Sequence, residues 1–185
     1  MERIELSIGG KDFVFAVDFE DDYDAGAPWE MADGHGPVSD WTERDKRPGE
    51  LLLNSRSRNT FTSCRYYDFA EACRIALRDG WDAAPYNDGT ETKRQQAARA
   101  ARADFEYLRA WCNDEWRYVG VVVTLLDPQG EKTEVSDSLW AVETLGDHHH
   151  ETARQLADEL AHGYVARWIG SQNRPTNISH KRARK

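Results

Sequence analysis

The chain has 185 residues, a length typical of one domain with at most a short appendage, and its formal net charge is −9. Seven Trp, seven Tyr and six Phe can supply a packed core, which excludes a disordered chain. No apolar run approaches the roughly 18 residues of a membrane span, and the alternation of charged and apolar residues over 1–5 is unlike a secretory signal.

The first elements follow from a change in pattern along residues 3–62. Apolar and polar residues alternate over 3–8 and again over 12–19, with two glycines between them, so the pattern predicts a β-hairpin. Residues 20–62 are rich in acids, Gly and Pro and show little periodicity. This composition predicts a long, irregular acidic loop, which in a compact domain is usually functional or partly disordered.

Two helices are predicted next. Asp68 is a candidate N-cap for a helix over about 69–79, and Gly80 supplies a left-handed residue at its end. A second helix is expected over about 93–115. Thr92 and Gln95 have the spacing of a capping box at its beginning.

The last third of the chain predicts a second hairpin and a third helix. Residues 119–126 form a continuous apolar run typical of a buried strand, and 131–145 form its partner. A helix follows over about 148–169, and 171–185 is a basic flexible tail. The sequence therefore predicts a single α+β domain over 1–170, in the order β-β-loop-α-α-β-β-α. Its two hairpins would form a four-stranded, mainly antiparallel sheet with three helices packed on it.

Acidic side chains are concentrated between residues 18 and 33, a segment without any base. Spaced carboxylates can imitate the phosphate array of a nucleic acid and occupy a basic groove on a partner. A solvated acidic surface is the alternative. The segment lacks the glycine and the terminal glutamate of an EF-hand loop, so no metal site is predicted. The candidate partner-binding residues are Asp18, Glu20, Asp21, Asp22, Asp24, Glu30 and Asp33.

A second group of candidates is basic. Arginines beside the pair Tyr66-Tyr67 could grip single-stranded nucleic acid, although the two tyrosines could equally be apolar residues leading into the first helix. The tail, with five bases and no acid in its last fifteen residues, could add phosphate contacts. The candidate nucleic-acid contacts are Arg56, Arg58, Arg65, Lys181 and Arg182.

Histidines offer a third, enzymatic hypothesis. His35 lies between two glycines, with Asp33 and Asp40 nearby in the chain, and could be a general base or an ordinary turn histidine. The cluster His148–His150 fans out by about 100° per residue at a helix entry, so it does not converge on a metal by itself. We assign no catalytic residue, no metal ligand and no cofactor.

The cysteines give no chemistry of their own. Cys64, Cys73 and Cys112 have no paired spacing, which indicates free thiols in a reducing cytoplasm. A zinc site built from two of them and a histidine is the alternative, but no C-x-x-C supports it.

Four segments carry a resemblance. They are GHGPVSDW at 34–41, RYYDFAEA at 65–72, DFEYLRAWCNDEW at 104–116 and VGVVV at 119–123. Together they resemble small uncharacterised acidic proteins of tailed phages and prophages, over about residues 20–165. The resemblance implies no activity. It implies an accessory factor, and many such factors disable host defences by binding.

The expected function combines this context with the charge distribution. We expect a phage-type accessory protein in the host bacterial cytoplasm that binds rather than catalyses. Its acidic surface would inhibit a host nucleic-acid-handling defence complex, of the anti-CRISPR or anti-restriction type, that presents a basic surface. No membrane partner is expected. The alternatives are a nucleic-acid-binding accessory protein and a small metal-dependent hydrolase that uses histidine and carboxylates.

Overall fold

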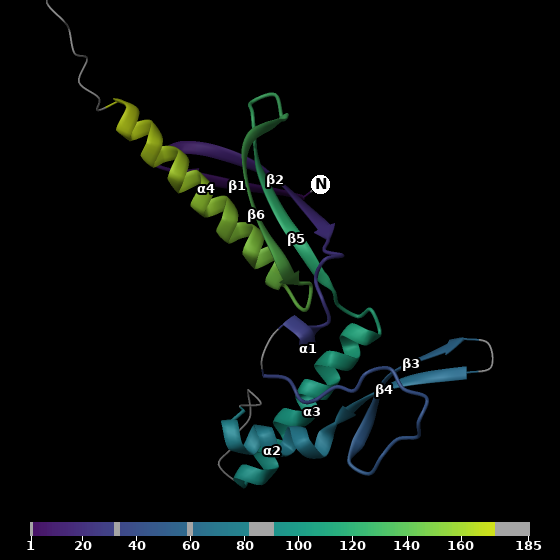
Figure 1. Ribbon diagram of the computed structural model, residues 1–185. Coiled ribbons are helices and arrows are strands. Elements are labelled where there is room, and N and C mark those ends of the chain that lie inside the picture. Colours follow the sequence, from purple (N-terminus) through teal and green to yellow (C-terminus); the bar gives the residue numbers. More distant parts are fainter. Residues whose placement is uncertain (1, 32–33, 59–60, 82–90, 173–185) are drawn as a thin grey trace, which may run out of the picture. The chain divides into compact units, whose positions relative to one another are not determined.

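The computed structural model describes residues 2–31, 34–58, 61–81 and 91–172, without the side chains of 58, 61 and 168–172. The elements follow the order β1-β2-α1-β3-β4-α2-α3-β5-β6-α4 (Figure 1). The chain divides into two compact units. Unit 1 consists of Met1–Asp22 and Val119–Lys185, and unit 2 consists of Tyr23–Tyr118. None of the described helices combines the length and hydrophobicity needed to cross a membrane.

Unit 1 is built on a four-stranded sheet with the strand order β1-β2-β5-β6. Gly9 and Gly10 both have positive φ, which glycine adopts without steric cost, and they join β1 and β2 in an antiparallel hairpin. β2 also pairs antiparallel with β5, so that Phe15 lies opposite Leu125. The four strands are β1 (Glu2–Ile8), β2 (Lys11–Asp21), β5 (Tyr118–Leu126) and β6 (Lys132–Glu143).

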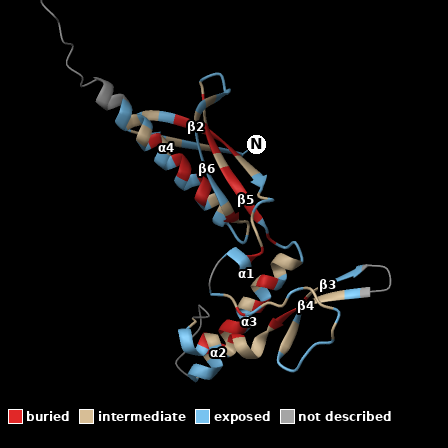
Figure 2. Ribbon diagram, in the orientation of Figure 1, coloured by how far each residue is buried: buried red, intermediate tan, exposed pale blue. Residues whose placement is uncertain are grey.

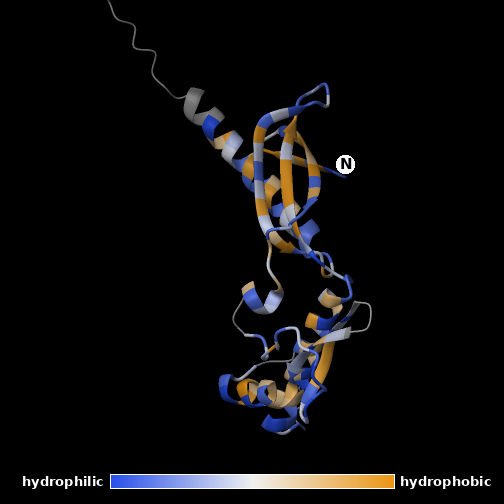
Figure 3. Cartoon of the chain, turned by 45° about the vertical axis from the view of Figure 1, so that its right-hand side comes forward, coloured by the Kyte–Doolittle hydropathy of each residue, from blue (hydrophilic) through white to orange (hydrophobic). Residues whose placement is uncertain are grey.

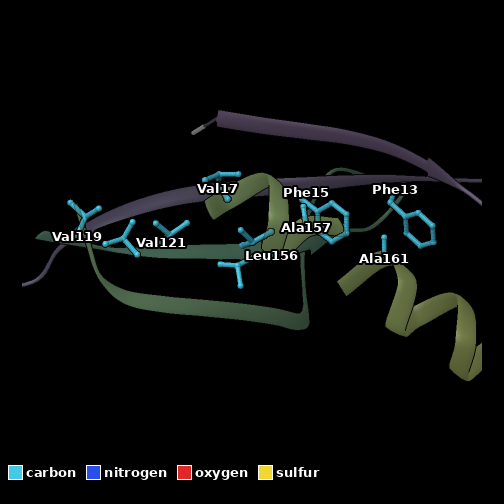
Figure 4. Packing of buried hydrophobic residues seen from close by; sticks show 11 residues of the cluster. Phe13, Phe15, Val17, Val119, Val121, Leu156, Ala157 and Ala161 are labelled. Carbon is cyan, nitrogen blue, oxygen red and sulfur yellow. The ribbon is translucent and has the colours of Figure 1, made fainter. Parts of the chain in front are cut away.

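The helix α4 (His148–Gln172) covers one face of this sheet and contacts β1, β2 and β6. Alternate residues of β2 and β5 pack against its inner side chains, as Figure 4 shows. Each large apolar side chain buried there contributes roughly 1.5–3 kcal/mol, so hydrophobic packing stabilises unit 1. The cluster consists of Phe13, Phe15, Val17, Val119, Val121, Val123, Val142, Ala153, Leu156, Ala157 and Ala161.

The distribution of buried residues in unit 1 follows from the central place of β5. Figure 2 shows buried residues along β2, β5 and one side of α4, and Figure 3 shows hydrophobic residues along the strands. β5 is buried on both of its faces because side chains of α4 pack on one face and the Trp140 ring covers Gly120 on the other. That position explains why its sequence is a continuous apolar run instead of an alternating one.

β6 contains a local irregularity at Trp140 and Ala141. Ala141 has a φ of 57°, a left-handed conformation that is costly for a residue with a Cβ. Its backbone N–H donates a hydrogen bond of 3.0 Å to Oδ2 of Asp22. Trp140 precedes Ala141, and its ring covers Gly120 on β5. A Cβ on Gly120 would lie 2.5 Å from this ring. Asp22 therefore stabilises an irregular edge strand.

Unit 2 contains a second, two-stranded sheet formed by β3 (Glu50–Arg58) and β4 (Phe61–Asp68). The segment that precedes β3 runs along the other edge of β4. The Ser39 N–H donates to the carbonyl of Tyr66 at 2.8 Å, and Thr42 and Cys64 exchange backbone hydrogen bonds of 2.9 and 2.7 Å. These bonds fix residues 38–42 beside the hairpin.

Three helices complete unit 2: α1 (Pro28–Met31), α2 (Phe69–Asp79) and α3 (Lys93–Cys112). α2 begins where the Asp68 side chain accepts the Glu71 N–H, and it ends at Gly80 in the left-handed conformation. α2 and α3 pack on each other and on β3. The larger of its buried clusters consists of Leu53, Tyr67, Ala72, Ala101, Phe105 and Leu108.

Several predictions from the sequence are confirmed. The chain is α+β, and two hairpins form a four-stranded antiparallel sheet. The helix predicted at 69–79 has those bounds, and the predicted capping box of Thr92 and Gln95 begins α3. α3 ends three residues before the predicted residue 115, and α4 extends three residues beyond 169.

Other predictions are wrong. Of the four helices described, only α4 lies on the four-stranded sheet, because α2 and α3 bury their apolar faces with β3 and Tyr67. The predicted irregular loop over 20–62 contains the end of β2, α1, all of β3 and the start of β4. A register shift between Leu52 and Asn54 interrupts the alternation in β3 and hides it from pattern analysis. The single domain expected over 1–170 stays a prediction, and the chain within it divides into two compact units.

Candidate functional site

An arginine–tryptophan cluster lies on the β3–β4 hairpin of unit 2. The guanidinium carbon of Arg56 is 4.2 Å from the Trp41 ring centroid, and that of Arg65 is 4.9 Å from the same centroid. Arg65 also lies 5.0 Å from the centroid of Trp29. These distances allow cation–π attraction. We call Arg56, Trp41, Arg65 and Trp29 the arginine–tryptophan cluster.

The β3–β4 register explains why the two arginines meet. Arg56 pairs with Ser63, and directly opposite residues of an antiparallel pair point to the same face. Ser63 and Arg65 are two residues apart on β4, so they also share a face. The backbone bonds between Thr42 and Cys64 then place Trp41 beside both arginines. Residues from four separate segments of the sequence, α1, 38–42, β3 and β4, form the cluster.

The cluster lacks neutralising carboxylates among the described residues. Neither Arg56 nor Arg65 forms an ion pair there, and Nε of Arg65 is buried without a hydrogen-bond partner. Arg44 shows the contrast, because it lies 4.9 Å from the Tyr66 ring centroid and donates two hydrogen bonds of 2.7 and 2.6 Å to Glu50. Those bonds lower the pKa of the Glu50 carboxyl. The terminal Nη groups of Arg56 and Arg65 therefore keep donors for an external acceptor, whereas the buried Nε of Arg65 does not reach one.

The structure brings together two of the five predicted basic contacts. Arg56 and Arg65 share the cluster, whereas the side chain of Arg58 and the tail residues Lys181 and Arg182 lie outside the described part. The sequence did not indicate Trp41 or Trp29 as partners of these arginines. The strand pairing of residues 38–42 with β4 reveals Trp41, and the contact of Arg65 with the ring of α1 reveals Trp29.

The predicted acidic surface is divided between the two units. Asp18 forms a 2.5 Å ion pair with Lys132, and Asp22 accepts the Ala141 N–H. In unit 2, Glu30 accepts a 3.3 Å bond from the Ala27 N–H at the start of α1. Glu20, Asp21 and Asp24 are exposed, and Asp33 lies outside the described residues.

These carboxylates are distributed over both units. Asp18 to Asp22 belong to unit 1, whereas Asp24 and Glu30 belong to unit 2. Asp18 is partly neutralised by its lysine, and Asp22 is engaged by the backbone. Inhibition of a host defence complex through an acidic surface, with a basic partner, thus stays a prediction to which the geometry adds no support.

A third feature of interest is the hydrogen-bond network around Asp104 in unit 2. Its carboxylate accepts from Nδ1 of His35 at 2.6 Å, from the Gly36 N–H at 2.8 Å and from the Tyr67 hydroxyl at 2.7 Å. The side chains of His35 and Asp104 are 19% and 10% exposed. Burial and the bond to Asp104 raise the pKa of Tyr67, so Tyr67 stays protonated and donates.

The network also packs tightly around the loop before β3. The imidazole of His35 stacks on the Tyr107 ring, with centroids 5.6 Å apart and an interplanar angle of 10°. Gly36 has no space for a side chain, because a Cβ there would lie 2.6 Å from the Cβ of Ala72 and collide with Tyr67. The position and orientation of His35 are therefore fixed from several sides.

The sequence identified His35 but not its partner. The acids near His35 in the chain are Asp33 and Asp40. The carboxylate that hydrogen-bonds the imidazole is instead Asp104, 69 positions away. A signal for Asp104 existed, since it is three residues after Ala101 and four before Leu108, on the buried stripe of α3. A carboxylate on an apolar stripe requires polar partners when the helix packs.

The histidine cluster at the start of α4 has a packing role in unit 1. The rings of His149 and His150 lie 5.0 and 5.2 Å from that of Phe19, and Nδ1 of His150 is 3.2 Å from Glu2. Burial, with a smaller contribution from His150, lowers the pKa of His149. Within the described residues no group of three or more His, Cys, Asp or Glu side chains could hold a metal.

Comparisons of the chain with protein-family models, with curated proteins and with solved structures found no match. The resemblance to phage proteins thus stays a prediction, and the functional argument depends on the geometry of the described residues. The two features that carry such an argument, the arginine–tryptophan cluster and the Asp104 network, both lie in unit 2.

Proposed function

We propose that the chain is an accessory protein that binds single-stranded nucleic acid through the arginine–tryptophan cluster. The observation that carries this proposal is the pair of guanidinium groups, Arg56 and Arg65, over one indole without an ion-pair partner among the described residues. This proposal develops the nucleic-acid-binding alternative that the sequence suggested. The sequence hypothesis used Arg56, Arg58 and Arg65. The proposed site uses Arg56 and Arg65 together with the Trp41 ring.

Stacking suits these arginines for phosphate recognition. A guanidinium that lies over an aromatic ring is held in one plane by cation–π attraction, while its N–H donors remain available at the edge of that plane. Phosphate oxygens accept such donors in a bidentate manner. Trp29 and Trp41 are half-buried, so their outer edges can also contact a base or a sugar.

The charge distribution is compatible with a local site of this kind. Unit 2 contains 17 acidic and 14 basic residues, which leaves it near neutrality, whereas unit 1 holds most of the net negative charge. A near-neutral unit repels a polyanion weakly, so a few unpaired arginines can determine where it binds. The proposal therefore predicts contact with few phosphates and an affinity that depends only weakly on salt concentration.

Fluorescence anisotropy with a labelled oligothymidine measures this contact. Single-stranded DNA loses affinity with a log–log salt slope of about 0.7 per neutralised phosphate, so two arginine contacts predict a slope of about −1.4 between roughly 50 and 200 mM salt. Arg56→Gln should weaken binding several-fold and reduce the slope by about 0.7. Arg65→Gln should do the same, and the double variant should bind least.

The matched control is Arg78→Gln on α2. Arg78 is 70% exposed and pairs with Asp79, so its removal changes the net charge equally but leaves the cluster intact. The control should bind like the unmodified chain. Equal losses in Arg78→Gln and Arg56→Gln would show a diffuse charge effect, and absence of binding at about 50 mM salt, where phosphate contacts are strongest, would refute the proposal.

A further inference from the structure

The Asp104 network faces a hollow on the surface of unit 2. The hollow has a volume of about 440 Å³ and is lined by Gly34, His35, Trp81, Ala100, Ala103, Asp104 and Tyr107. Its size falls within the range of small-ligand sites. Small residues on α3 leave the space open, and three aromatic rings contribute to its walls.

The hydrogen bonds around Asp104 determine what His35 offers to this hollow. A carboxylate only accepts hydrogen bonds, so the 2.6 Å contact requires that Nδ1 of His35 carries the proton. In the neutral imidazole, Nε2 is then an acceptor. The stack on Tyr107 holds the ring in place. In its neutral form, His35 therefore offers an acceptor of fixed position at the wall of the hollow.

This chemistry selects the class of ligand. None of the described residues that line the hollow is a lysine or arginine, so an anionic group such as phosphate gains nothing from them and meets the charge of Asp104. A metal is equally disfavoured, because the oxygens of Asp104 already accept three hydrogen bonds. Among its described lining residues there is also no Ser, Thr or Cys to act as a nucleophile. What fits is a flat ring that stacks on Trp81 and donates an N–H.

We propose that this hollow binds one unpaired nucleobase, which stacks on the aromatic walls and donates an N–H to Nε2 of His35. The inference rests on the proposed function, because a base of the bound strand would be the natural occupant. It adds a site for the base to the contact that the arginines make with phosphate. Bases with an exocyclic amine or a ring N–H are preferred, since they supply the donor that His35 accepts.

Free nucleosides test the base site separately from the arginines. Adenosine carries an exocyclic amine, and purine riboside is the same nucleoside without it. With millimolar adenosine, ¹⁵N NMR of the imidazole should show a shift of the His35 Nε2 signal, whereas purine riboside should bind about five- to ten-fold more weakly, the effect expected for one lost hydrogen bond. Equal affinity for the two nucleosides would overturn the role of His35.

Two variants locate the site. Trp81→Ala should reduce adenosine affinity about ten-fold, as expected when one stacking partner is lost, and His35→Phe should remove the preference for adenosine over purine riboside. His162→Phe is the matched control, because His162 is 62% exposed on α4 in unit 1 and should leave binding unchanged. If neither the Trp81 nor the His35 variant differs from this control, the hollow is not the base site.

The two proposals fail in different ways. The double variant of Arg56 and Arg65 should lose oligothymidine binding and keep adenosine binding. Oligothymidine binding by the unmodified chain together with no adenosine binding would overturn the base site and leave the arginine contact standing. Adenosine binding without any oligothymidine binding would support the hollow as a nucleoside site and overturn the proposed function.

Discussion

Unit 1 and unit 2 use different means to hold their elements together. Unit 1 packs one helix on a four-stranded sheet through an apolar cluster of Phe, Val, Leu and Ala. Unit 2 places a buried Tyr67 and the Asp104 carboxylate between its hairpin and α3, next to a smaller apolar cluster. Polar groups need specific partners when they are buried, so unit 2 depends more on exact geometry.

This difference indicates where function resides. An apolar core accepts many sequences of similar volume, whereas a satisfied polar network fixes particular side chains in particular places. In unit 2 the network orients His35 toward a hollow, and strand pairing brings Arg56 and Arg65 to Trp41. We therefore regard unit 1 as the scaffold and unit 2 as the unit that binds.

The largest expected effect comes from removing one core side chain in each unit. Phe15 and Leu108 are 1% and 0% exposed, so Phe15→Ala should cost about 3–5 kcal/mol and Leu108→Ala about 2–5 kcal/mol in unfolding free energy. Hydrogen exchange should show the loss of protection confined to unit 1 for the first and to unit 2 for the second. A uniform loss over both units in either variant would show that they unfold as one.

The polar network of unit 2 predicts the next effect. Tyr67→Phe removes the hydroxyl that donates to Asp104 and should cost about 1.5–3 kcal/mol, because the lost bond involves a charged acceptor. Tyr66→Phe is the control, since its hydroxyl donates 3.0 Å to the neutral carbonyl of Arg44 and should cost only about 0.5–1.5 kcal/mol. Denaturant unfolding measures both. Equal costs would contradict the importance of the Asp104 network.

Two glycines compare the packing of the units directly. A Cβ on Gly36 would meet Ala72 and Tyr67, both buried, so Gly36→Ala should cost about 1–3 kcal/mol. A Cβ on Gly120 would meet the ring of Trp140, which is 48% exposed and can move away, so Gly120→Ala should cost less. Thermal unfolding of the two variants should preserve this order. A larger loss of stability for Gly120→Ala than for Gly36→Ala would mean that the Trp140 ring is less able to move than the residues around Gly36.

The smallest effect concerns the pH dependence of unit 1. Burial lowers the pKa of His149 below its ordinary value of 6.5, so the folded state favours the neutral ring. Its contribution to stability is present above about pH 6.5 and is lost as the pH falls through the lower, folded-state pKa. His149→Phe should flatten the stability of unit 1 between pH 7 and pH 5, whereas the exposed His162→Gln should retain the slope. Parallel profiles for both variants would exclude His149 as the cause.

Elements of unit 1 could be predicted because their signals are local. Alternation over 3–8 and 12–19, with two glycines between, specifies a hairpin from neighbouring residues alone. The capping residues Asp68 and Thr92 marked the helix starts of unit 2 in the same way. β3 could not be predicted, because its register shift and its polar second half remove the alternation.

The candidate sites depended on contacts distant in the sequence. Arg56 and Arg65 were recognisable as basic residues, but their common ring, Trp41, lies at least 15 positions away and is placed by β4. Asp104 was hidden for a similar reason, since its partners His35 and Tyr67 are 69 and 37 positions away. The acidic segment 18–33 appeared continuous in sequence, yet its residues belong to two units.

The sequence by itself determined the α+β class, the paired strands of unit 1 and the beginning of the helices, because turn residues, caps and hydrophobic periodicity act over a few neighbouring residues. Only the tertiary structure decided that residues 23–118 form a separate unit, that Asp104 holds His35 and that Trp41 lies beneath two arginines. Those contacts arise when strands and helices pack, and the pairing of distant side chains leaves no periodic trace in the chain.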